Sequence, residues 1–434
     1  MTLTKDSLAT VGVAEEVEAR RPHAATHAPE AAGPARASVM LLRLLRAAQP
    51  VSRAELARRL GVNRSTVTDT FKPLIAAGVV REEAVQQPAR HDGARSLGRP
   101  AVALSFDDGQ DYFAGVNVGV RHSTVGLATI NGEVLAEEEF DTPSEPGDAL
   151  RRIVSVVEGL RVSAPGRKLR AVGVSVPGPT DATRRRVVYA PHLGWDDVDL
   201  AGALCFGEDG AECGAEGTVP VAVENDATAA ALYEAHLRLG RADSGRLEDF
   251  VVVRSGTGIG LGLVLGGEVY RGGGLGAGHA GEFGHMTIVA GGKPCVCGNR
   301  GCWERYASAS SASSLYAGDR VQLSGQAAPR FVEIVARAEG GELRARRTLE
   351  RVGEYLGIGI ANVITGLGVP RVIVSGRLVY GWKFMSEPLR GAVAQSMAGR
   401  LNGWSVEPGE ASGAGLGGAL EVAVEGFITS GLGV

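Results

Sequence analysis

The segment from Glu282 to Glu304 constrains the fold of this 434-residue chain more than any other. It contains one histidine and three cysteines within eighteen positions, at His285, Cys295, Cys297 and Cys302. One imidazole nitrogen and three thiolates complete the four-coordinate shell of a structural zinc ion, which leaves no open position for a catalytic water. The spacing therefore predicts a zinc ion that stiffens a loop with a carboxylate at each end.

Clustered cysteines can also form disulfides or pack as small apolar residues. The chain has five cysteines, with Cys205 and Cys213 outside the segment, and an odd number suits a reducing compartment. The segment is rich in glycine and shows no apolar period, which argues against a purely packed role. No apolar run reaches the roughly 18 residues of a membrane span, and the N-terminus lacks the apolar core of a secretory signal. We therefore expect zinc binding and a cytoplasmic location.

Charge is distributed unevenly along the chain. Residues 36–100 hold twelve Lys/Arg and five Asp/Glu, whereas the whole chain has a formal net charge of −4. A compact basic segment on an acidic body is typical of a nucleic-acid-binding module. Residues 1–35 are rich in Ala, Pro and Glu without periodicity, so we expect a disordered tail before this module.

The basic segment contains the start and stop signals of three helices. An apolar helix after Ala37 must stop at Pro50, and a capping box over Ser52–Glu55 opens a second helix. Gly61 stands at the C-cap of that helix, and Asn63 at the N-cap of a third. The apolar face of the third helix is expected to consist of Val67, Phe71, Leu74 and Ile75. Two helices joined by a tight glycine turn predict a helix-turn-helix.

Strands at 79–80 and 101–106 would add a wing to this motif, giving a winged helix-turn-helix DNA-binding domain over residues 36–108. A solvated helical bundle with surface charge is the alternative, which the polar third helix and the basic wing disfavour. Pro73 should kink the third helix, but the end that would read bases lies before it. The residues predicted to contact operator DNA are Arg53, Arg64, Ser65, Thr66, Thr68, Lys72, Arg95 and Arg99.

From Tyr112 onward, strands alternate with helices and end in glycine-rich or polar turns. Examples are Pro177–Pro179 after a buried strand, Glu224–Asp226 before a helix, and Gly256–Gly260 between two strands. This alternation predicts an α/β protein whose site lies at the strand ends.

These motifs, taken in order, resemble the ROK family of repressors, open reading frames and sugar kinases, in its transcription-factor branch. The resemblance rests on the helix-turn-helix, Val-Pro-Gly-Pro at 176–179, Glu-Asn-Asp-Ala at 224–227, Gly-Thr-Gly-Ile-Gly at 256–260, and Gly-His-Ala-Gly-Glu-Phe-Gly-His-Met at 278–286 with the cysteine loop after it. It implies that residues 109–434 form an actin-like, ribonuclease H-like domain of two lobes, with a zinc loop at 285–302. It also implies a sugar bound in the cleft, and homodimers or homotetramers.

The resemblance also assigns roles residue by residue. It assigns zinc to His285, Cys295, Cys297 and Cys302, and the sugar hydroxyls to Gly178, Asn225, Asp226, Glu282, His285 and Glu304. Carboxylates and an amide suit vicinal hydroxyls, since a site built for hydroxyls rejects analogues that lack them. Without the resemblance, Asn225 and Asp226 would be interpreted as a helix N-cap pair after a strand. His192 stands where relatives often carry Asn.

The nucleotide half of the cleft decides between two function classes. Family kinases carry Asp-x-Gly-Gly-Thr there, whereas this chain has Asn117–Arg121, and Ser375–Arg377 also departs from the expected Gly-Gly. We therefore expect a sugar-responsive transcriptional regulator, a repressor, with zinc as a structural cofactor and no catalytic residue. The alternative is an ATP-dependent hexose kinase with an appended DNA-binding domain, in which Asp226 is the general base. A third interpretation is that a phosphotransferase-system protein, instead of a sugar, controls the regulator by sequestering it.

Overall fold

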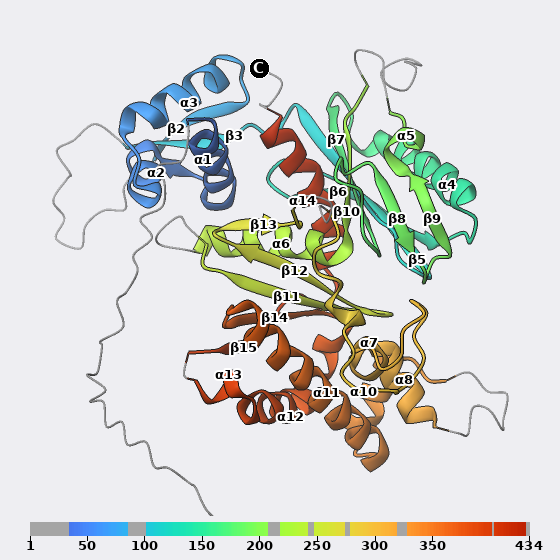
Figure 1. The fold of residues 1–434 in the computed structure, drawn as a ribbon. Coiled ribbons are helices and arrows are strands. Elements are labelled where there is room, and N and C mark those ends of the chain that lie inside the picture. Colours follow the sequence, from blue (N-terminus) through green and yellow to red (C-terminus); the bar gives the residue numbers. More distant parts are fainter. Residues whose placement is uncertain are drawn as a thin grey trace, which may run out of the picture.

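The computed structural model describes residues 34–85, 101–206, 218–241, 247–273, 278–318, 328–401 and 403–430. Figure 1 shows a small N-terminal head attached to a body of two lobes. The expected tail over 1–35 lies outside the described ranges, except for its last two residues, which begin the first helix. No helix in the described ranges is long and apolar enough to cross a membrane.

The head combines three helices with a three-stranded antiparallel sheet (Figure 1). The strand order is β1-β3-β2, so β3 is central. The elements are α1 (Pro34–Ala48), β1 (Val51–Ser52), α2 (Arg53–Leu60), α3 (Arg64–Ala76), β2 (Val80–Val85) and β3 (Ala101–Phe106). These helices and strands confirm the predicted winged helix-turn-helix, and the loop between β2 and β3 lies outside the described residues.

Local capping defines the turn between α2 and α3. The Ser52 hydroxyl accepts a hydrogen bond from the Glu55 amide at 3.2 Å, and Gly61 ends α2 in the left-handed region at φ 67°. Asn63 occupies the N-cap position of α3 in an extended conformation, although its side chain makes no capping bond. The predicted cap positions of Ser52, Gly61 and Asn63 are therefore confirmed.

The third helix keeps its apolar face although it contains a proline. It continues through Pro73 to its end, so this residue does not stop the helix. Val67, Phe71 and Leu74 are buried and Ile75 is partly buried, as the periodicity predicts. The opposite, polar face of α3 is therefore exposed to solvent.

The first lobe is built on a five-stranded mixed sheet. The strand order is β10-β7-β4-β5-β6, and β7 runs parallel to both β4 and β10. Because β7 and β10 are parallel, their carboxyl ends meet at one edge, where Asn225 lies in register with Val176. The elements are β4 (Asp111–Asn117), β5 (His122–Ala128), β6 (Val134–Asp141), α4 (Pro146–Leu160), η1 (Arg161–Ser163), β7 (Lys168–Val176), β8 (Arg186–Ala190), β9 (Trp195–Asp199), α5 (Leu200–Ala203) and β10 (Val221–Asn225).

The second lobe has its own five-stranded sheet, in the order β13-β12-β11-β14-β15, with helices packed against it (Figure 1). Its strands are β11 (Phe250–Ser255), β12 (Ile259–Leu265), β13 (Glu268–Tyr270), β14 (Arg371–Gly376) and β15 (Ser405–Pro408). Its helices are η3 (Glu282–His285), α7 (Glu304–Ala307), α8 (Ala309–Ala317), α10 (Phe331–Glu339), α11 (Leu343–Leu367), η4 (Arg377–Gly381), α12 (Trp382–Gln395) and α13 (Met397–Arg400).

Two helices lie between the sheets, α6 (Asp226–Arg241) and α14 (Ala414–Thr429). The chain enters α14 from the second lobe, yet α14 packs on β4 and β7 of the first. Gly173 of β7 permits this approach, because a Cβ at that position would lie 2.1 Å from the Ala419 carbonyl oxygen. Two mixed sheets with helices between and around them confirm the predicted two-lobed α/β architecture.

The head packs on these two helices through a shared apolar core. Leu41 and Leu45 of α1 belong to the same buried cluster as Leu239 of α6 and Phe427 and Ile428 of α14. All five side chains are buried. Head and body therefore share a continuous core at this contact.

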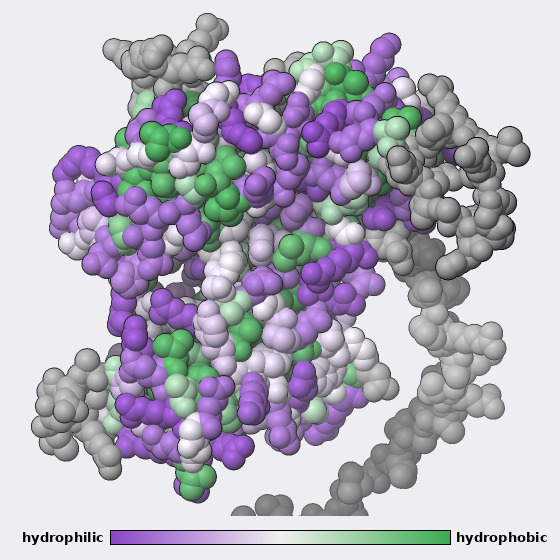
Figure 2. Space-filling model, turned by 180° about the vertical axis from the view of Figure 1, so that it is seen from behind, coloured by the Kyte–Doolittle hydropathy of each residue, from purple (hydrophilic) through white to green (hydrophobic). Residues whose placement is uncertain are grey.

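The surface carries apolar side chains in small, separate patches. On the face opposite to that of Figure 1, Figure 2 shows these patches scattered among hydrophilic residues. Single exposed apolar side chains are normal on protein surfaces. The most exposed of the large ones among the described residues are Val162, Leu343, Met397 and Leu401.

Candidate functional site

A cavity of about 990 Å³ is lined by residues of both lobes. All six residues expected to bind a sugar line it, which are Gly178, Asn225, Asp226, Glu282, His285 and Glu304. The first three come from the edge where β7 and β10 end, and the others come from the two ends of the cysteine loop. The cavity continues into the expected nucleotide half, along Asn117–Arg121. The fold thus joins segments that lie far apart in the sequence.

The four expected metal ligands form one cluster. The ligand atoms of His285, Cys295, Cys297 and Cys302 all lie within 4.8 Å of one another, so they could hold a metal ion. Cys297 Sγ is 3.8 Å from Cys302 Sγ, and Cys295 Sγ is 3.6 Å from His285 Nδ1. These three cysteines are free, which excludes the disulfide alternative for them, whereas Cys205 is disulfide-bonded. Burial raises the pKa of both Cys295 and Cys302.

Trp303 anchors the cysteine loop in the second lobe. Its indole is fully buried and donates from Nε1 to the carbonyl oxygen of Tyr355 on α11 at 2.9 Å. Gly359 on the same helix leaves room for the ring, since a Cβ there would lie 1.9 Å from it. An antiparallel bridge between Thr287 and Cys302 closes the base of the loop. The loop is therefore held by the lobe's core as well as by its own ligands.

Glu304 connects the metal cluster to the cavity. Its Oε1 accepts a hydrogen bond from Cys295 Sγ at 3.0 Å and lies 3.6 Å from His192 Nε2. Burial alone would raise the pKa of this carboxyl, but the His192 imidazole and the Cys295 thiol outweigh burial and lower it. A Cβ at Gly258 would lie 2.3 Å from Glu304 Oε2. The Gly-Thr-Gly-Ile-Gly turn between β11 and β12 therefore also makes room for this carboxylate.

Glu282 faces the same cavity in a different electrostatic environment. Burial, together with the negative charges of Asp226 and Glu304, raises the pKa of Glu282 to about 7. Its Oε2 lies 3.7 Å from His285 Nε2. A carboxyl that titrates near neutrality can donate as well as accept a hydrogen bond, which suits a hydroxyl ligand.

The side chain of Asn225 forms its hydrogen bonds with backbone groups around it. Its Oδ1 accepts hydrogen bonds from the amides of Ala227 and Thr228 at 2.9 and 3.2 Å, which caps α6. Its Nδ2 donates to the Gly178 carbonyl oxygen at 3.0 Å. Gly178 has φ 100°, and a Cβ there would lie 2.2 Å from the Tyr189 carbonyl oxygen. The helix-cap interpretation thus describes Asn225, and its contact with a sugar stays a prediction.

Arg254 is a cavity residue that the sequence reasoning missed. It lies on β11, and its Nε donates to Asp226 Oδ2 at 3.0 Å. The side chain is 18% exposed and lines the cavity, so the guanidinium occupies part of the space beside Asp226. The signal was present in the sequence, because Arg254 is a lone charge that follows the apolar run Val251–Val253 in a central strand.

The expected nucleotide half of the cavity differs from the expected sugar half in the residues that line it. Asn117 ends β4, and its amide packs so closely on α14 that a Cβ at Gly415 would lie 3.1 Å from Nδ2. Val120 and Arg121 continue the cavity wall beyond it. The position of the kinase carboxylate is thus filled by an amide that contacts the first turn of α14.

The residues expected to contact DNA lie mostly on the outward face of α3. Arg64, Ser65, Thr68 and Lys72 are exposed, and Thr66 is partly buried. On α2, the Arg53 guanidinium pairs with Glu82 of β2 at 2.5 Å, so it is partly committed within the head. Arg95 and Arg99 lie outside the described residues. The structure therefore gathers a polar and basic face on the second helix of the motif, where DNA-reading contacts are expected.

Comparison with known families agrees with this division into head and body. Residues 36–83 match a helix-turn-helix domain, and residues 113–425 match the ROK family. The chain belongs to the ROK family. A similar solved structure is that of a ROK family transcriptional regulator, a homologue of the E. coli Mlc protein. It has a TM-score of 0.72 and 23% identity, and covers 92% of this chain and 97% of that one.

Two further relatives match different shares of the chain. The xylose repressor of Bacillus subtilis (strain 168) is 28% identical over 368 residues, covering 83% of this chain and 87% of the repressor. A ROK family glucokinase from Streptomyces griseus, solved in complex with glucose and AMPPNP, has a TM-score of 0.57 and 25% identity. It covers 72% of this chain and 99% of the kinase. The repressor is thus matched over more of the chain than the family kinase.

Proposed function

We propose that the protein is a sugar-responsive transcriptional regulator, a repressor whose operator affinity is set by a sugar bound between the two lobes. The chain combines a helix-turn-helix head with a ROK body, and its match to the xylose repressor covers 83% of the chain. The cavity lining supports a hydroxyl ligand, because Asp226, Glu282 and Glu304 present carboxyl groups to one space.

The ion pair between Arg254 and Asp226 is the observation that carries the preference for a regulator over a kinase. In the alternative, Asp226 is the general base that takes the proton of the acceptor hydroxyl, and it must reach that proton directly. Here one of its carboxylate oxygens is already bonded to Arg254 at 3.0 Å. The phosphate side weakens the kinase alternative further, since Asn117 replaces the expected carboxylate.

The cysteine cluster fits zinc as its metal. With Zn–S near 2.3 Å and Zn–N near 2.1 Å, a tetrahedral site places two sulfurs about 3.8 Å apart and a sulfur and a nitrogen about 3.6 Å apart. The corresponding separations in the cluster are 3.8 Å and 3.6 Å. Ligation through Nδ1 would leave the Nε2 of His285 facing Glu282 and the cavity. The metal would then orient a cavity residue and stiffen the loop, without taking part in a reaction.

Operator recognition by this motif normally uses two heads. Helix-turn-helix dimers bind half-sites one helical turn apart, so we propose a homodimer or a homotetramer. Sugar binding would move the two heads relative to each other, and this movement would weaken binding to the operator.

The test uses the full-length protein and a duplex selected by it from a randomised DNA library. Fluorescence anisotropy with D-xylose, D-glucose or no sugar should show specific binding that one of the sugars weakens at least about ten-fold. A parallel assay with ATP and Mg²⁺ should show no turnover near the roughly 1–100 s⁻¹ that is typical of kinases. Kinase-like turnover would favour the hexose kinase instead. Operator binding that neither sugar changes would favour sequestration by a phosphotransferase-system protein.

A further inference from the structure

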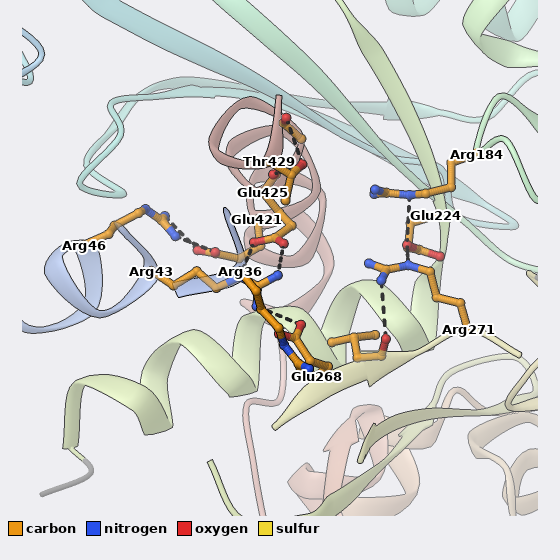
Figure 3. Close-up of polar contacts among 12 residues, drawn as sticks. Arg36, Arg43, Arg46, Arg184, Glu224, Glu268, Arg271, Glu421, Glu425 and Thr429 are labelled. Atoms are coloured by element: carbon orange, nitrogen blue, oxygen red, sulfur yellow. Dashed lines mark hydrogen bonds and ion pairs between the residues drawn. The ribbon is translucent and has the colours of Figure 1, made fainter. Parts of the chain in front are cut away.

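Strand β13 holds ion pairs to two other parts of the molecule (Figure 3). At its start, Glu268 Oε2 accepts a hydrogen bond at 2.8 Å from Nη1 of Arg43, which lies on α1 of the head. Directly after its end, Arg271 donates from Nε to Glu224 Oε2 of the first lobe at 2.6 Å. A three-residue edge strand of the second lobe therefore contacts the DNA-binding head at one end and the first lobe at the other.

The Arg271 end lies next to the sugar cavity. Its partner Glu224 is 1% exposed and directly precedes Asn225, which lines the cavity. The guanidinium of Arg184 lies 3.3 Å from the same carboxylate oxygen (Figure 3). Of the two arginines, Arg271 makes the shorter contact with this buried carboxylate, so it is expected to follow Glu224 when the lobes move.

At the other end, Arg43 holds both lobes at once. Besides Glu268 of the second lobe, its guanidinium bonds Glu425 of α14, from Nε to Oε2 at 3.1 Å and from Nη2 to Oε1. Because α14 packs on β4 and β7 of the first lobe, Glu425 is expected to move with that lobe. The donors of a guanidinium have a fixed geometry, so Arg43 can keep both partners only while the two lobes keep their present spacing.

Arg46, one turn further along α1, provides a contrast. It pairs through two hydrogen bonds with Glu421 of α14, at 2.5 and 2.8 Å, and donates from Nε to the Ile130 carbonyl oxygen at 2.6 Å. These two partners belong to the first lobe or to the helix packed on it, and Arg46 Nη1 also lies 3.3 Å from His236 Nδ1 of α6. Arg46 therefore fixes the head to the first lobe and to the helices between the lobes, whereas Arg43 also binds an edge strand of the second lobe.

We propose that β13 and Arg43 transmit sugar binding from the cavity to the DNA-binding head, a mechanism that rests on the function proposed above. A sugar held by residues of both lobes changes their spacing, and Arg43 then loses either Glu268 or Glu425. The head keeps its Arg46 anchor but changes its angle on the body. That change alters the fit of α3 to operator half-sites.

The test compares Glu268→Gln with a control, Glu407→Gln, in the full-length protein. Glu407 accepts a hydrogen bond from Arg238 at 2.7 Å and is also a partly exposed carboxylate of the second lobe, but it does not contact the head. For each protein, calorimetry gives the affinity for D-xylose and D-glucose, and anisotropy gives operator affinity with and without sugar. Arg43→Lys is the second variant, because a single ammonium cannot replace the fork that joins Glu268 and Glu425.

Both Glu268→Gln and Arg43→Lys should bind sugar at least as tightly as the wild type does, because binding no longer has to break the full set of ion pairs at Arg43. The sugar-induced change in operator affinity should shrink at least about five-fold in each, and the control should keep the wild-type change. If Glu268→Gln does not fold, the result for Arg43→Lys decides alone. An undiminished sugar response in a folded variant would overturn the mechanism and leave the proposed function intact. A wild-type protein whose operator affinity no sugar changes would overturn both.

Discussion

The proposed preference for a sugar sensor over a sugar kinase rests on single side chains of this cavity. Asp226 is retained at the base position, yet Arg254 bonds it, and Asn117 replaces the carboxylate of the phosphate side. Glu282 and Glu304 remain on the hydroxyl-reading side, with opposite pKa shifts that come from different neighbours. Under the proposed function, the loss of catalysis and the retention of sugar binding would therefore depend on different residues of one site.

Replacing Arg254 tests how far it supports the sugar side. Arg254→Met removes the partner of Asp226 and leaves three carboxyl groups facing one another with less compensating charge. Hydrogen bonds to charged groups contribute about 1.5–3 kcal/mol, so sugar affinity should fall by roughly ten-fold or more. Calorimetry measures this, with Arg121→Met in the nucleotide half of the same cavity as the control. Equal losses in both variants would argue against a specific role for Arg254.

Replacing Cys297 tests the metal. Cys297→Ser removes one of four ligands and should lower bound zinc from about one per chain, open the loop and abolish the sugar response. Structural zinc contributes about 10–16 kcal/mol of apparent folding free energy in zinc-finger peptides, so the effect should be large. Elemental analysis and calorimetry check it, with Val296→Ser as the control, since that exposed neighbour is no ligand. Zinc-free wild-type protein that still binds sugar would contradict the assignment.

Among the helices, α3 carries the expected contact with DNA. Arg64 is exposed at its first turn, where the helix of this motif reaches base edges or phosphates. Arg64→Ala should weaken operator binding by about 1–3 kcal/mol, measured by anisotropy at fixed salt. Arg151→Ala on α4 removes an equal charge elsewhere and should change little. Unchanged affinity in Arg64→Ala would remove Arg64 from the interface.

Helices and strands were predictable where the signal is local. Ser52 and Gly61 mark the two ends of α2 as expected, because capping depends on residues within one turn. The metal cluster was predictable for the same reason, since all four ligands lie in one short segment. The pairing of Arg254 with Asp226 was not, because the fold brings together a residue of β11 and the first residue of α6. The ion pairs at the two ends of β13 were likewise not predictable from the sequence, because their partners lie in α1 and β10.

The attachment of the head to the body is a property of the whole molecule, and it combines apolar packing with buried charge. The apolar core shared by α1, α6 and α14 supplies contact area, and the pair between Arg46 and Glu421 fixes its register. Removing one partner of a buried pair costs about 3–5 kcal/mol, because the other charge stays buried without compensation. Glu421→Gln should therefore lower the unfolding free energy by about 3 kcal/mol at pH 7. Urea unfolding of the full chain measures this, with Glu350→Gln in an exposed pair as the control.

Acidification gives the same pair a second, independent signature. Burial by itself would raise the pKa of Glu421, but the charges of Arg46 and His236 outweigh burial and lower it in the folded protein. The stabilisation is therefore complete above the unfolded-state pKa of about 4.3, and it is lost as the pH falls through the lower folded-state value. The difference in stability between the wild type and Glu421→Gln should be the same at pH 7 and pH 6 and should narrow below about pH 4.3. If that gap instead widened on acidification, Glu421 would be protonated in the folded protein, and the head would be held by packing alone.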